Sequence, residues 1–249
     1  MRILGIIPAR YASTRFHAKA LVDIGGKTMV RRVYEQVQKS QSISKIVVAT
    51  DHELIANEVK SFGGEVCMTS TEHKSGTERC MEVVKLQKEK FDYVINIQGD
   101  EPFISPKQID TLGYLLNGKI QLATLIKQIG NTEELINPNI VKVIFDKQQE
   151  AIYFSRSAIP YARGLEQNEW LNNHKYYKHI GMYAYRCDIL EEITKLSPTP
   201  LEKAESLEQL RWIEHGFKIK VNETKVESIG IDTPADLEKA LKLLNSGDL

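Results

Sequence analysis

Three basic residues follow the first apolar segment of the chain, in a loop that is otherwise small or polar. The apolar segment, Leu4–Ile7, ends at Pro8, and Arg10, Arg15 and Lys19 follow. An arginine can bind two phosphate oxygens at once, and a lysine supplies a mobile point charge. Loops after strands hold phosphates with such cations and with backbone N–H groups. The pattern predicts a site for a strongly anionic ligand, and a basic surface turn is the alternative.

The loop matches neither of two common nucleotide-binding fingerprints. No G-x-G-x-x-G follows the apolar segment, and Gly25-Gly26-Lys27-Thr28 lacks the upstream glycine of G-x-x-x-x-G-K-[ST]. We interpret residues 25–28 as a turn that leads into a helix.

Two aspartates follow other strand-like segments, Asp100 in "QGDEP" and Asp232 in "IGIDTP". Mg²⁺ takes one or two protein carboxylates and completes its shell with phosphate oxygens and water. Each aspartate also has a structural interpretation. Gly-Asp is a common turn, and Thr233 as N-cap, Pro234 at N1 and Asp236 would begin a helix with a capping-box-like pattern. A shared magnesium site is predicted if the fold brings the two aspartates together.

The remaining candidates carry weaker signals. In "EHKSGTER" (72–79), Ser75 either caps a helix or contacts a nucleotide base. A lone histidine beside a strand, such as His179, is more often structural. Glu208 and Gln209 lie off the apolar stripe of a helix predicted at 203–215, which is typical of a solvated face. Arg156 in "YFSRSAIP" completes the set.

The elements that must position these residues alternate in the first half of the chain. The strand-like segments are 3–7, 46–50, 65–69 and 93–98, and helical periodicity covers 28–39, 52–62, 77–90 and a stretch from Ser105-Pro106 to Gly118. This alternation predicts an α/β fold, with a mostly parallel sheet flanked by helices. Ligands bind such sheets beyond the carboxyl ends of the strands.

The pattern changes after residue 120. Strand-like segments at 122–129, 141–147, 150–155 and 179–186 predict a smaller, interleaved antiparallel lobe, and the polar stretch 161–178 predicts a flexible or interface loop. The ending "IGIDTPADLEKALKLL" predicts a strand, a turn and a helix. We therefore expect a core of residues 1–120, a second lobe of 121–202, and a segment, 203–249, that returns to the core.

The composition limits the classes of partner. The 249 residues contain 33 Lys plus Arg and 33 Asp plus Glu, so the net charge is zero. A nucleic-acid partner is not expected, because that affinity needs excess cations, and neither a polybasic patch nor a long apolar run predicts membrane binding. Three widely spaced cysteines suit a reducing compartment. We expect a cytoplasmic protein.

Taken in order, the motifs resemble those of one enzyme family. "IIPARYASTR…K", "VATDH", "HKSGTER", "NIQGDEP", "YFSRSAIP", "KHIGMYAYR", "LEQLRWIEHG" and "GIDTPADLEKA" resemble the 3-deoxy-manno-octulosonate cytidylyltransferases from residue 3 to about 241. The resemblance implies a Rossmann-like nucleotidyltransferase sheet and a reaction of CTP with the acid sugar Kdo. That reaction gives CMP-Kdo for lipopolysaccharide biosynthesis and pyrophosphate, with Mg²⁺ and commonly in a homodimer.

The resemblance also implies roles for individual residues. Catalysis is assigned to Arg10, Lys19, Asp100 and Asp232, of which the two aspartates are also the metal ligands. Nucleotide binding is assigned to Pro8, Ala9, Arg10, Ser13, Arg15, Lys19 and Ser75. Sugar binding is assigned to Gln98, Arg156, His179, Glu208 and Gln209. Positioning and charge neutralisation dominate phosphoryl-type transfer, so the sugar's anomeric hydroxyl would attack the α-phosphate in line with departing pyrophosphate.

One stretch departs from the family pattern. The family loop usually runs "STRLPGKPL", whereas this chain has "STRFHAKAL", with Phe16, His17, Ala18 and Ala20 at the changed positions. The loss of a proline and a glycine changes the backbone constraints on the loop. Two alternatives therefore stay open: a cytidylyltransferase for another acid sugar, such as amino-Kdo or a sialic acid, and a non-catalytic nucleotide-binding protein. The presence of both Asp100 and Asp232 argues against the second.

Overall fold

The computed structural model describes residues 1–12, 16–227 and 229–246. It divides into two compact units, Met1–Tyr114 with Val226–Leu249, and Leu115–Lys225. The sequence placed the first boundary at 120 and the return to the core at 203. In the structure the return begins at Val226, because a strand at Ile219–Glu223 pairs within the second unit.

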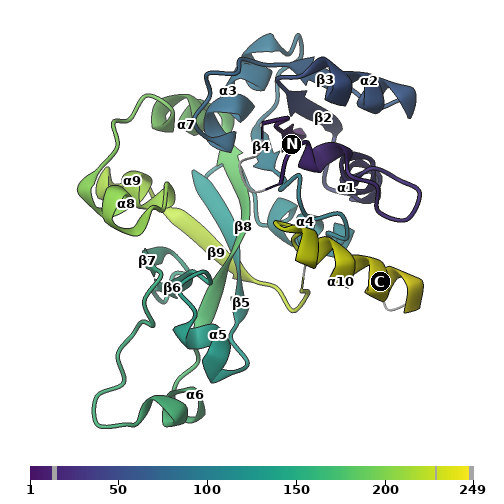
Figure 1. Ribbon diagram of the computed structural model, residues 1–249. Coiled ribbons are helices and arrows are strands. Elements are labelled where there is room, and N and C mark those ends of the chain that lie inside the picture. The colour runs from purple at the N-terminus through teal and green to yellow at the C-terminus, as the bar shows by residue number, and fades with distance from the viewer. Residues whose placement is uncertain (13–15, 228, 247–249) are drawn as a thin grey trace. The chain divides into compact units, whose positions relative to one another are not determined.

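The first unit contains a parallel sheet in the order β3-β2-β1-β4 (Figure 1). Its strands are β1 (Ile3–Ala9), β2 (Lys45–Thr50), β3 (Val66–Met68) and β4 (Tyr93–Asn96). β1 pairs in parallel with both β2 and β4, and β2 pairs in parallel with β3. The four predicted strands and the α/β class are confirmed, and the carboxyl ends of the strands form one edge.

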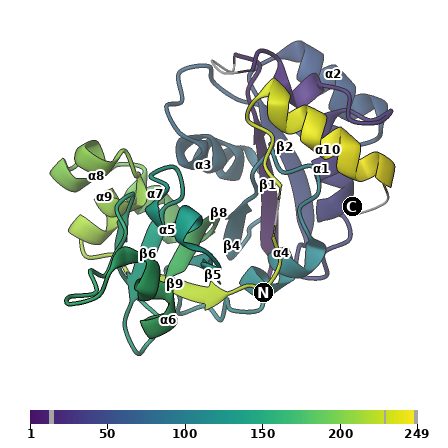
Figure 2. The ribbon, with the colours of Figure 1, turned by 60° about the horizontal axis from the view of Figure 1, so that its bottom comes forward.

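Helices cover both faces of this sheet. Figure 2 shows α3 on one face and α1, α2 and α10 on the other. The helices of this unit are α1 (Met29–Val37), α2 (Glu53–Ser61), α3 (Gly76–Leu86), α4 (Pro106–Gly113) and α10 (Pro234–Ser246), with a short 3-10 helix η1 (Lys19–Leu21). Helix α4 ends five residues before the predicted stop at Gly118, which instead adopts a left-handed turn conformation (φ 82°).

Helix α10 joins the first unit through an apolar cluster. Ile24, Met29, Ile231 and Ala240 are fully buried together, and Phe16 packs against them. Burial of this kind contributes about 25 cal/mol per Å² of apolar surface. Phe16, one of the residues that departs from the family pattern, therefore anchors the start of η1 in the core of the unit.

The second unit is built on a mixed sheet. Strand β5 (Leu122–Gln128) pairs antiparallel with β8 (Tyr177–Arg186) and parallel with β9 (Ile219–Glu223). Strands β6 (Lys142–Phe145) and β7 (Ala151–Ser155) form an antiparallel pair. The four strands predicted in this region are confirmed. The antiparallel pairing expected in this lobe is confirmed, and β9, which was not recognised in the sequence, adds one parallel pair.

Several helices of this unit were not predicted. They are α5 (Thr132–Ile136), α6 (Trp170–Asn173) and α7 (Cys187–Ile193), with a 3-10 helix η2 (Gln167–Glu169). The stretch 161–178, predicted to be irregular, thus contains η2, α6 and the first residues of β8. Within the described ranges, no helix combines the length and the apolar character needed to cross a lipid bilayer.

The helix predicted at 203–215 is two helices. α8 (Pro200–Glu205) and α9 (Gln209–Glu214) are separated at Ser206, which has a left-handed backbone (φ 53°). A break of this kind resets the helical register. As a result Gln209 and Trp212 are buried, and the expectation that Gln209 faces solvent is wrong.

Candidate active site

The loop after β1 begins at the ligand-binding edge of the parallel sheet. Pro8 and Ala9 are the last residues of β1, and Arg10 follows them, half-buried. The Tyr11 carbonyl accepts a hydrogen bond from the Ala18 N–H (3.1 Å), which closes the base of the loop. Ser13 and Arg15 lie outside the described residues.

Ala18 adopts a backbone conformation that favours glycine. Its φ and ψ are 52° and 28°, in the left-handed region. The family pattern has glycine at this position, so the chain keeps the turn with a residue that is strained there. Ala18 therefore adopts the left-handed turn at a conformational cost of about 1–2 kcal/mol.

Lys19, the first residue of η1, brings the two predicted aspartates together. Its ammonium nitrogen Nζ donates to Asp100 Oδ2 (2.9 Å) and to Asp232 Oδ1 (2.9 Å). The Lys19 side chain is 15% exposed, against 31% and 43% for the two carboxylates. Burial lowers the pKa of Lys19, but the charges and hydrogen bonds of the two aspartates outweigh this effect and hold the pKa above its usual 10.5. Lys19 is therefore a permanent cation.

Backbone contacts hold both aspartates in place. A Cβ added to Gly99 would lie 2.5 Å from the Pro8 carbonyl oxygen, so only glycine allows this close approach between the "QGDEP" turn and the end of β1. The Ile231 N–H donates to the Asp100 carbonyl (2.9 Å), which links the segments that carry the two carboxylates. The segment before Asp232 was expected to be a strand but is irregular in the structure, and the hydrogen bond from the Ile231 N–H aligns it with the turn that carries Asp100.

The predicted start of the last helix is confirmed. The Asp236 carboxylate accepts hydrogen bonds from the backbone N–H of Asp232 (3.2 Å) and of Thr233 (2.9 Å). The Thr233 hydroxyl also donates to Asp236 (2.8 Å), and the Asp236 N–H donates back to it (3.3 Å). This capping network fixes the backbone of Asp232, so its structural and chemical interpretations are compatible.

The donor set fits a magnesium ion. Two carboxylate oxygens converge on one cation, the Lys19 ammonium, so the position favours positive charge. Among the residues that the structure describes, no group of three or more His, Cys, Asp or Glu side chains could hold a metal. Mg²⁺ commonly takes only one or two carboxylates beside substrate phosphate and water, so Asp100 and Asp232 would suffice together with a triphosphate.

Ser75 caps helix α3. Its hydroxyl accepts a hydrogen bond from the Glu78 N–H (3.2 Å), and the structural interpretation of Ser75 is therefore confirmed. A Cβ on the following Gly76 would lie 3.1 Å from Asn96 Nδ2 and 3.7 Å from Pro8 Cγ, so the start of α3 is close to the ends of β4 and β1. Gln98, half-buried after β4, belongs to the same unit.

The second unit places His179 in a buried polar cluster. His179 Nε2 lies 3.0 Å from the Thr124 hydroxyl, which also contacts the carbonyls of Ile180 (3.0 Å) and Met182 (2.8 Å). Because this hydroxyl has one proton and faces two carbonyls, we assign the proton between the ring and the hydroxyl to His179 Nε2. Burial lowers the pKa of His179 to about 3, so the ring is neutral with Nδ1 as its acceptor.

Tyr183 joins this cluster and was missed in the sequence. Its ring centroid lies 5.1 Å from that of His179, and within the described part of the chain its buried hydroxyl has no protein partner. Burial raises its pKa well above 10, with smaller contributions from Tyr185 and from the carboxylate of Glu208. The register shift between β5 and β8 at Thr124/Leu125 leaves Tyr183 opposite Thr124 and His179 opposite Ile126, so the two rings occupy neighbouring positions on one face of the sheet. Gly181 within a strand pattern was the available signal for this bulge.

Arg156 has structural partners in the second unit. Its Nε donates to the Glu205 carbonyl (2.7 Å), and its two Nη atoms donate to the carbonyls of Pro138 (3.1 Å) and Ser206 (3.5 Å). These bonds hold the turn between α8 and α9, which leads to Glu208 and Gln209. Arg156 therefore supports the backbone next to those residues, and some of its N–H groups remain for a ligand.

Comparison with known proteins identifies the family. The family model described as Cytidylyltransferase matches residues 4–243. The chain is 54% identical to 3-deoxy-manno-octulosonate cytidylyltransferase of Parabacteroides distasonis, over 98% of each chain, and 55% identical to that of Cytophaga hutchinsonii, over 94% of each. A solved structure of CMP:2-keto-3-deoxy-manno-octonic acid synthetase complexed with CTP superposes with a TM-score of 0.91 and 40% identity, covering 99% of this chain and 100% of that one. The chain belongs to the cytidylyltransferase family of nucleotidyltransferases.

Proposed function

We propose that the chain transfers the cytidylyl group of CTP to 3-deoxy-D-manno-octulosonate, forming CMP-Kdo and pyrophosphate. The observation that carries the proposal is the convergence of Lys19 and Asp100, which follow β1 and β4 of the parallel sheet, with Asp232, which precedes α10. Two carboxylates and a permanent cation can bind a metal–triphosphate complex. The names of the curated relatives and of the CTP-bound neighbour support the choice of CTP and of this sugar.

In the proposed reaction the anomeric hydroxyl of the sugar attacks the α-phosphorus of CTP. The new bond joins that oxygen to phosphorus, the bond to the bridging oxygen of pyrophosphate breaks, and the hydroxyl proton passes to solvent. Both substrates are anionic, so the protein's main tasks are positioning and charge neutralisation. Lys19, together with Arg10 and Arg15, neutralises the departing pyrophosphate.

Asp100 and Asp232 are the proposed magnesium ligands. When bound, magnesium supplies charge neutralisation at the phosphates and favours ionisation of a hydroxyl that it contacts. In the structure both carboxylates accept a hydrogen bond from the Lys19 ammonium. Lys19 must therefore release at least one of them to reach the phosphates when the substrate complex forms.

The nucleotide is proposed to lie along the edge that is formed by the loop after β1 and by the residues at the amino end of α3. Pro8, Ala9 and Arg10 end the first strand, Ser13 and Arg15 belong to the same loop, and Ser75 lies at the amino end of α3. Backbone N–H groups at a helix start favour anionic or acceptor groups. We assign these residues, together with Lys19, to CTP.

The sugar is proposed to contact Gln98, Arg156, His179, Glu208 and Gln209, to which we add Tyr183. The neutral His179 ring offers Nδ1 as an acceptor, and the Tyr183 hydroxyl is buried with its hydrogen bonds unsatisfied by the described protein. A buried polar group that only the correct sugar hydroxyl satisfies discriminates strongly between sugars. Arg156 is the candidate partner of the sugar carboxylate.

Another acid sugar, such as amino-Kdo or a sialic acid, remains the alternative substrate. The changed residues of the β1 loop motivate it. An assay of CTP with a panel of acid sugars separates the two. Release of pyrophosphate with Kdo supports the proposal. Release with another sugar but not with Kdo contradicts it. A Tyr183→Phe variant should raise the KM for the sugar more than the KM for CTP.

We further propose that the enzyme is a cytoplasmic homodimer that supplies an activated sugar for lipopolysaccharide synthesis. The balanced charge of the chain fits a small-molecule enzyme without a nucleic-acid or membrane partner. Light scattering on the purified protein tests the dimer: a mass of one chain contradicts it.

A further inference from the structure

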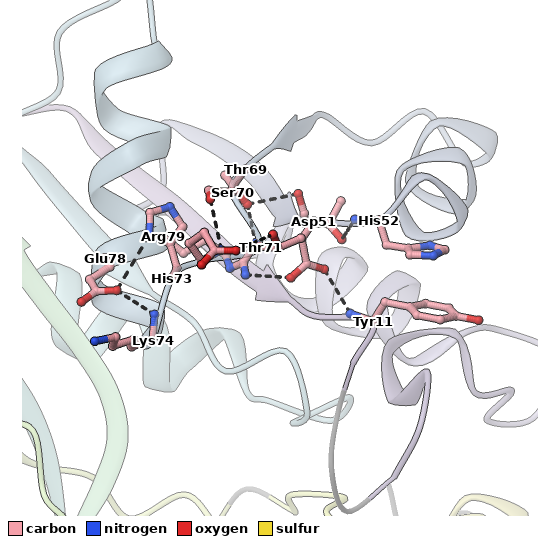
Figure 3. A network of polar contacts seen from close by, with 12 residues as sticks. Tyr11, Asp51, His52, Thr69, Ser70, Thr71, His73, Lys74, Glu78 and Arg79 are labelled. Carbon is pink, nitrogen blue, oxygen red and sulfur yellow. Dashed lines mark hydrogen bonds and ion pairs between the residues drawn. The ribbon is translucent and has the colours of Figure 1, made fainter.

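A buried arginine connects the beginnings of two loops at the candidate active site. Arg79 of α3 is fully buried. Its Nη2 donates to Asp51 Oδ2 (2.9 Å), directly after β2, and its Nη1 donates to the hydroxyl of Thr69, directly after β3. Figure 3 shows Asp51 between Arg79 and Tyr11. One guanidinium therefore holds the carboxyl ends of two neighbouring strands.

Asp51 extends this connection to the loop after β1. Its second oxygen, Oδ1, accepts a hydrogen bond from the Tyr11 N–H (3.3 Å). The Tyr11 ring also stacks on His52, with centroids 3.7 Å apart and planes 9° apart, and the edge of His17 packs against it at 4.9 Å. Tyr11 is thus held by its backbone N–H and by the contacts of its ring with His52 and His17.

Tyr11 in turn fixes the start of the segment that carries Lys19. The Tyr11 carbonyl accepts the N–H of Ala18, the residue with the left-handed backbone, and Lys19 follows it directly. The contacts form a continuous path from Arg79 through Asp51 and Tyr11 to Ala18. Each step is a hydrogen bond or a covalent bond, so we expect a change at Asp51 to shift the Lys19 backbone.

We propose that Asp51 and Arg79 are positioning residues that hold Lys19 in register with the triphosphate of the nucleotide. The inference rests on the proposed function. It explains how the two ends of the loop are held without the proline and glycine of the family pattern: the ion pair fixes Tyr11, His17 packs on the Tyr11 ring, and Phe16 packs against the apolar cluster.

The energetics favour a positioning role over a purely stabilising one. Removing a guanidinium from water is costly, and a buried ion pair often stabilises a fold no more than apolar side chains would. Arg79 Nε is buried without a hydrogen-bond partner among the residues that the structure describes, which adds to that cost. The pair does, however, connect the carboxyl ends of β3, β2 and β1. These ends form the edge of the sheet at which ligands bind.

The test is a double-mutant cycle between Asp51→Asn and Lys19→Met. We expect Asp51→Asn to weaken CTP binding, measured by calorimetry without sugar, and to lower kcat about 10- to 100-fold, as supporting residues of reactive groups commonly do. In the Lys19→Met background the same change should cause little further loss, because Asp51 acts through Lys19. Arg79→Lys should retain more CTP affinity than Arg79→Met.

Asp110→Asn is the matched control. Asp110 also accepts backbone N–H groups, those of Gln41 (2.9 Å) and Ser42 (3.0 Å), but in the segment before β2, at the opposite edge of the same sheet. The Asp110→Asn variant should have a lower melting temperature than the wild type and the same CTP affinity. The positioning role would be overturned if Asp51→Asn lowered CTP affinity and kcat equally in the wild-type and Lys19→Met backgrounds. It would also be overturned if Asp110→Asn lowered CTP affinity as much as Asp51→Asn does. Absence of wild-type turnover with CTP and Kdo would contradict the proposed function instead, while CTP affinity would still test the inference.

Discussion

Replacing Lys19 by methionine should separate the stability of the protein from its activity. The substitution removes two ion pairs, to Asp100 and to Asp232, whose carboxylates are 31% and 43% exposed. Pairs this accessible to water contribute about 0.2–1 kcal/mol each. We therefore expect a loss of roughly 1 kcal/mol in the free energy of unfolding, equivalent to a melting temperature about 2–4 °C lower for a chain of this size.

The loss of activity should be much larger. A preorganised cation that meets developing charge in the transition state typically contributes about 100- to 1,000-fold in kcat, or roughly 3–4 kcal/mol. Lys19 is held by two carboxylates and stays protonated, because its pKa is raised. The variant should thus be folded at room temperature with kcat reduced by at least about 100-fold.

Lys27→Met provides the matched control. Lys27 forms an ion pair with Glu35 (2.6 Å), and its side chain is 41% exposed. The same chemical change there should leave kcat within about twofold because Lys27 is not part of the candidate site, and it should change the free energy of unfolding by no more than about 0.5 kcal/mol. The assays are pyrophosphate release at saturating CTP and sugar, and thermal denaturation. Unchanged turnover in Lys19→Met, or a loss matched by Lys27→Met, would refute the role given to Lys19.

The same variant also tests the metal site without turnover. Lys19→Met removes the ammonium that both carboxylates contact, so millimolar Mg²⁺ should raise the melting temperature of this variant more than that of the wild type. Equal shifts in both proteins would contradict the assignment of the two aspartates as a shared cation site.

Three further predictions follow from single contacts. Ala18→Gly should raise the free energy of unfolding by up to about 1 kcal/mol in urea denaturation, because relief of the left-handed strain exceeds the entropic cost of glycine; a lower stability would contradict the strained turn. Gly99→Ala should destabilise by about 1–3 kcal/mol and lower turnover, because its Cβ would meet the Pro8 carbonyl at 2.5 Å, and an unchanged melting temperature would contradict that close approach. His179 stays neutral in the fold with a pKa of about 3, against 6.5 for an ordinary histidine. Below pH 6.5 the unfolded chain therefore binds a proton that the folded chain does not, so stability should fall by about 1.4 kcal/mol per pH unit. The stability of His179→Gln should depend less steeply on pH than that of the wild type. Identical dependence of stability on pH in the two proteins would contradict the burial of a neutral ring.

The sequence predicted those parts of the structure that depend on local pattern. The strands around Leu4–Ile7 and before Asp100 were predictable because buried parallel strands are continuous apolar runs. The cap at Thr233 was predictable because its residue types have a local hydrogen-bonding reason. Lys19 and Asp100 could be expected near each other because both follow strands of one parallel sheet.

Other features depend on distant contacts and had no local signal. The break at Ser206 uses a left-handed serine, which sequence patterns do not favour. β9 is an exception, because apolar and polar residues alternate from Phe217 to Asn222 and this signal was overlooked. The Asp51–Arg79 pair depends on the register between β2 and α3, and the position of Tyr183 depends on a bulge in β8. These are the features that shape the site beyond its motifs.

Pyrophosphate release from CTP and Kdo, with and without Mg²⁺, tests the central claim most directly. We expect the wild-type protein to release one pyrophosphate for each CMP-Kdo formed in the presence of Mg²⁺. Release should fall to background when the metal is chelated or when Asp100 is replaced by alanine. Binding of CTP without release of pyrophosphate with Kdo, or full release by Asp100→Ala, would contradict the account.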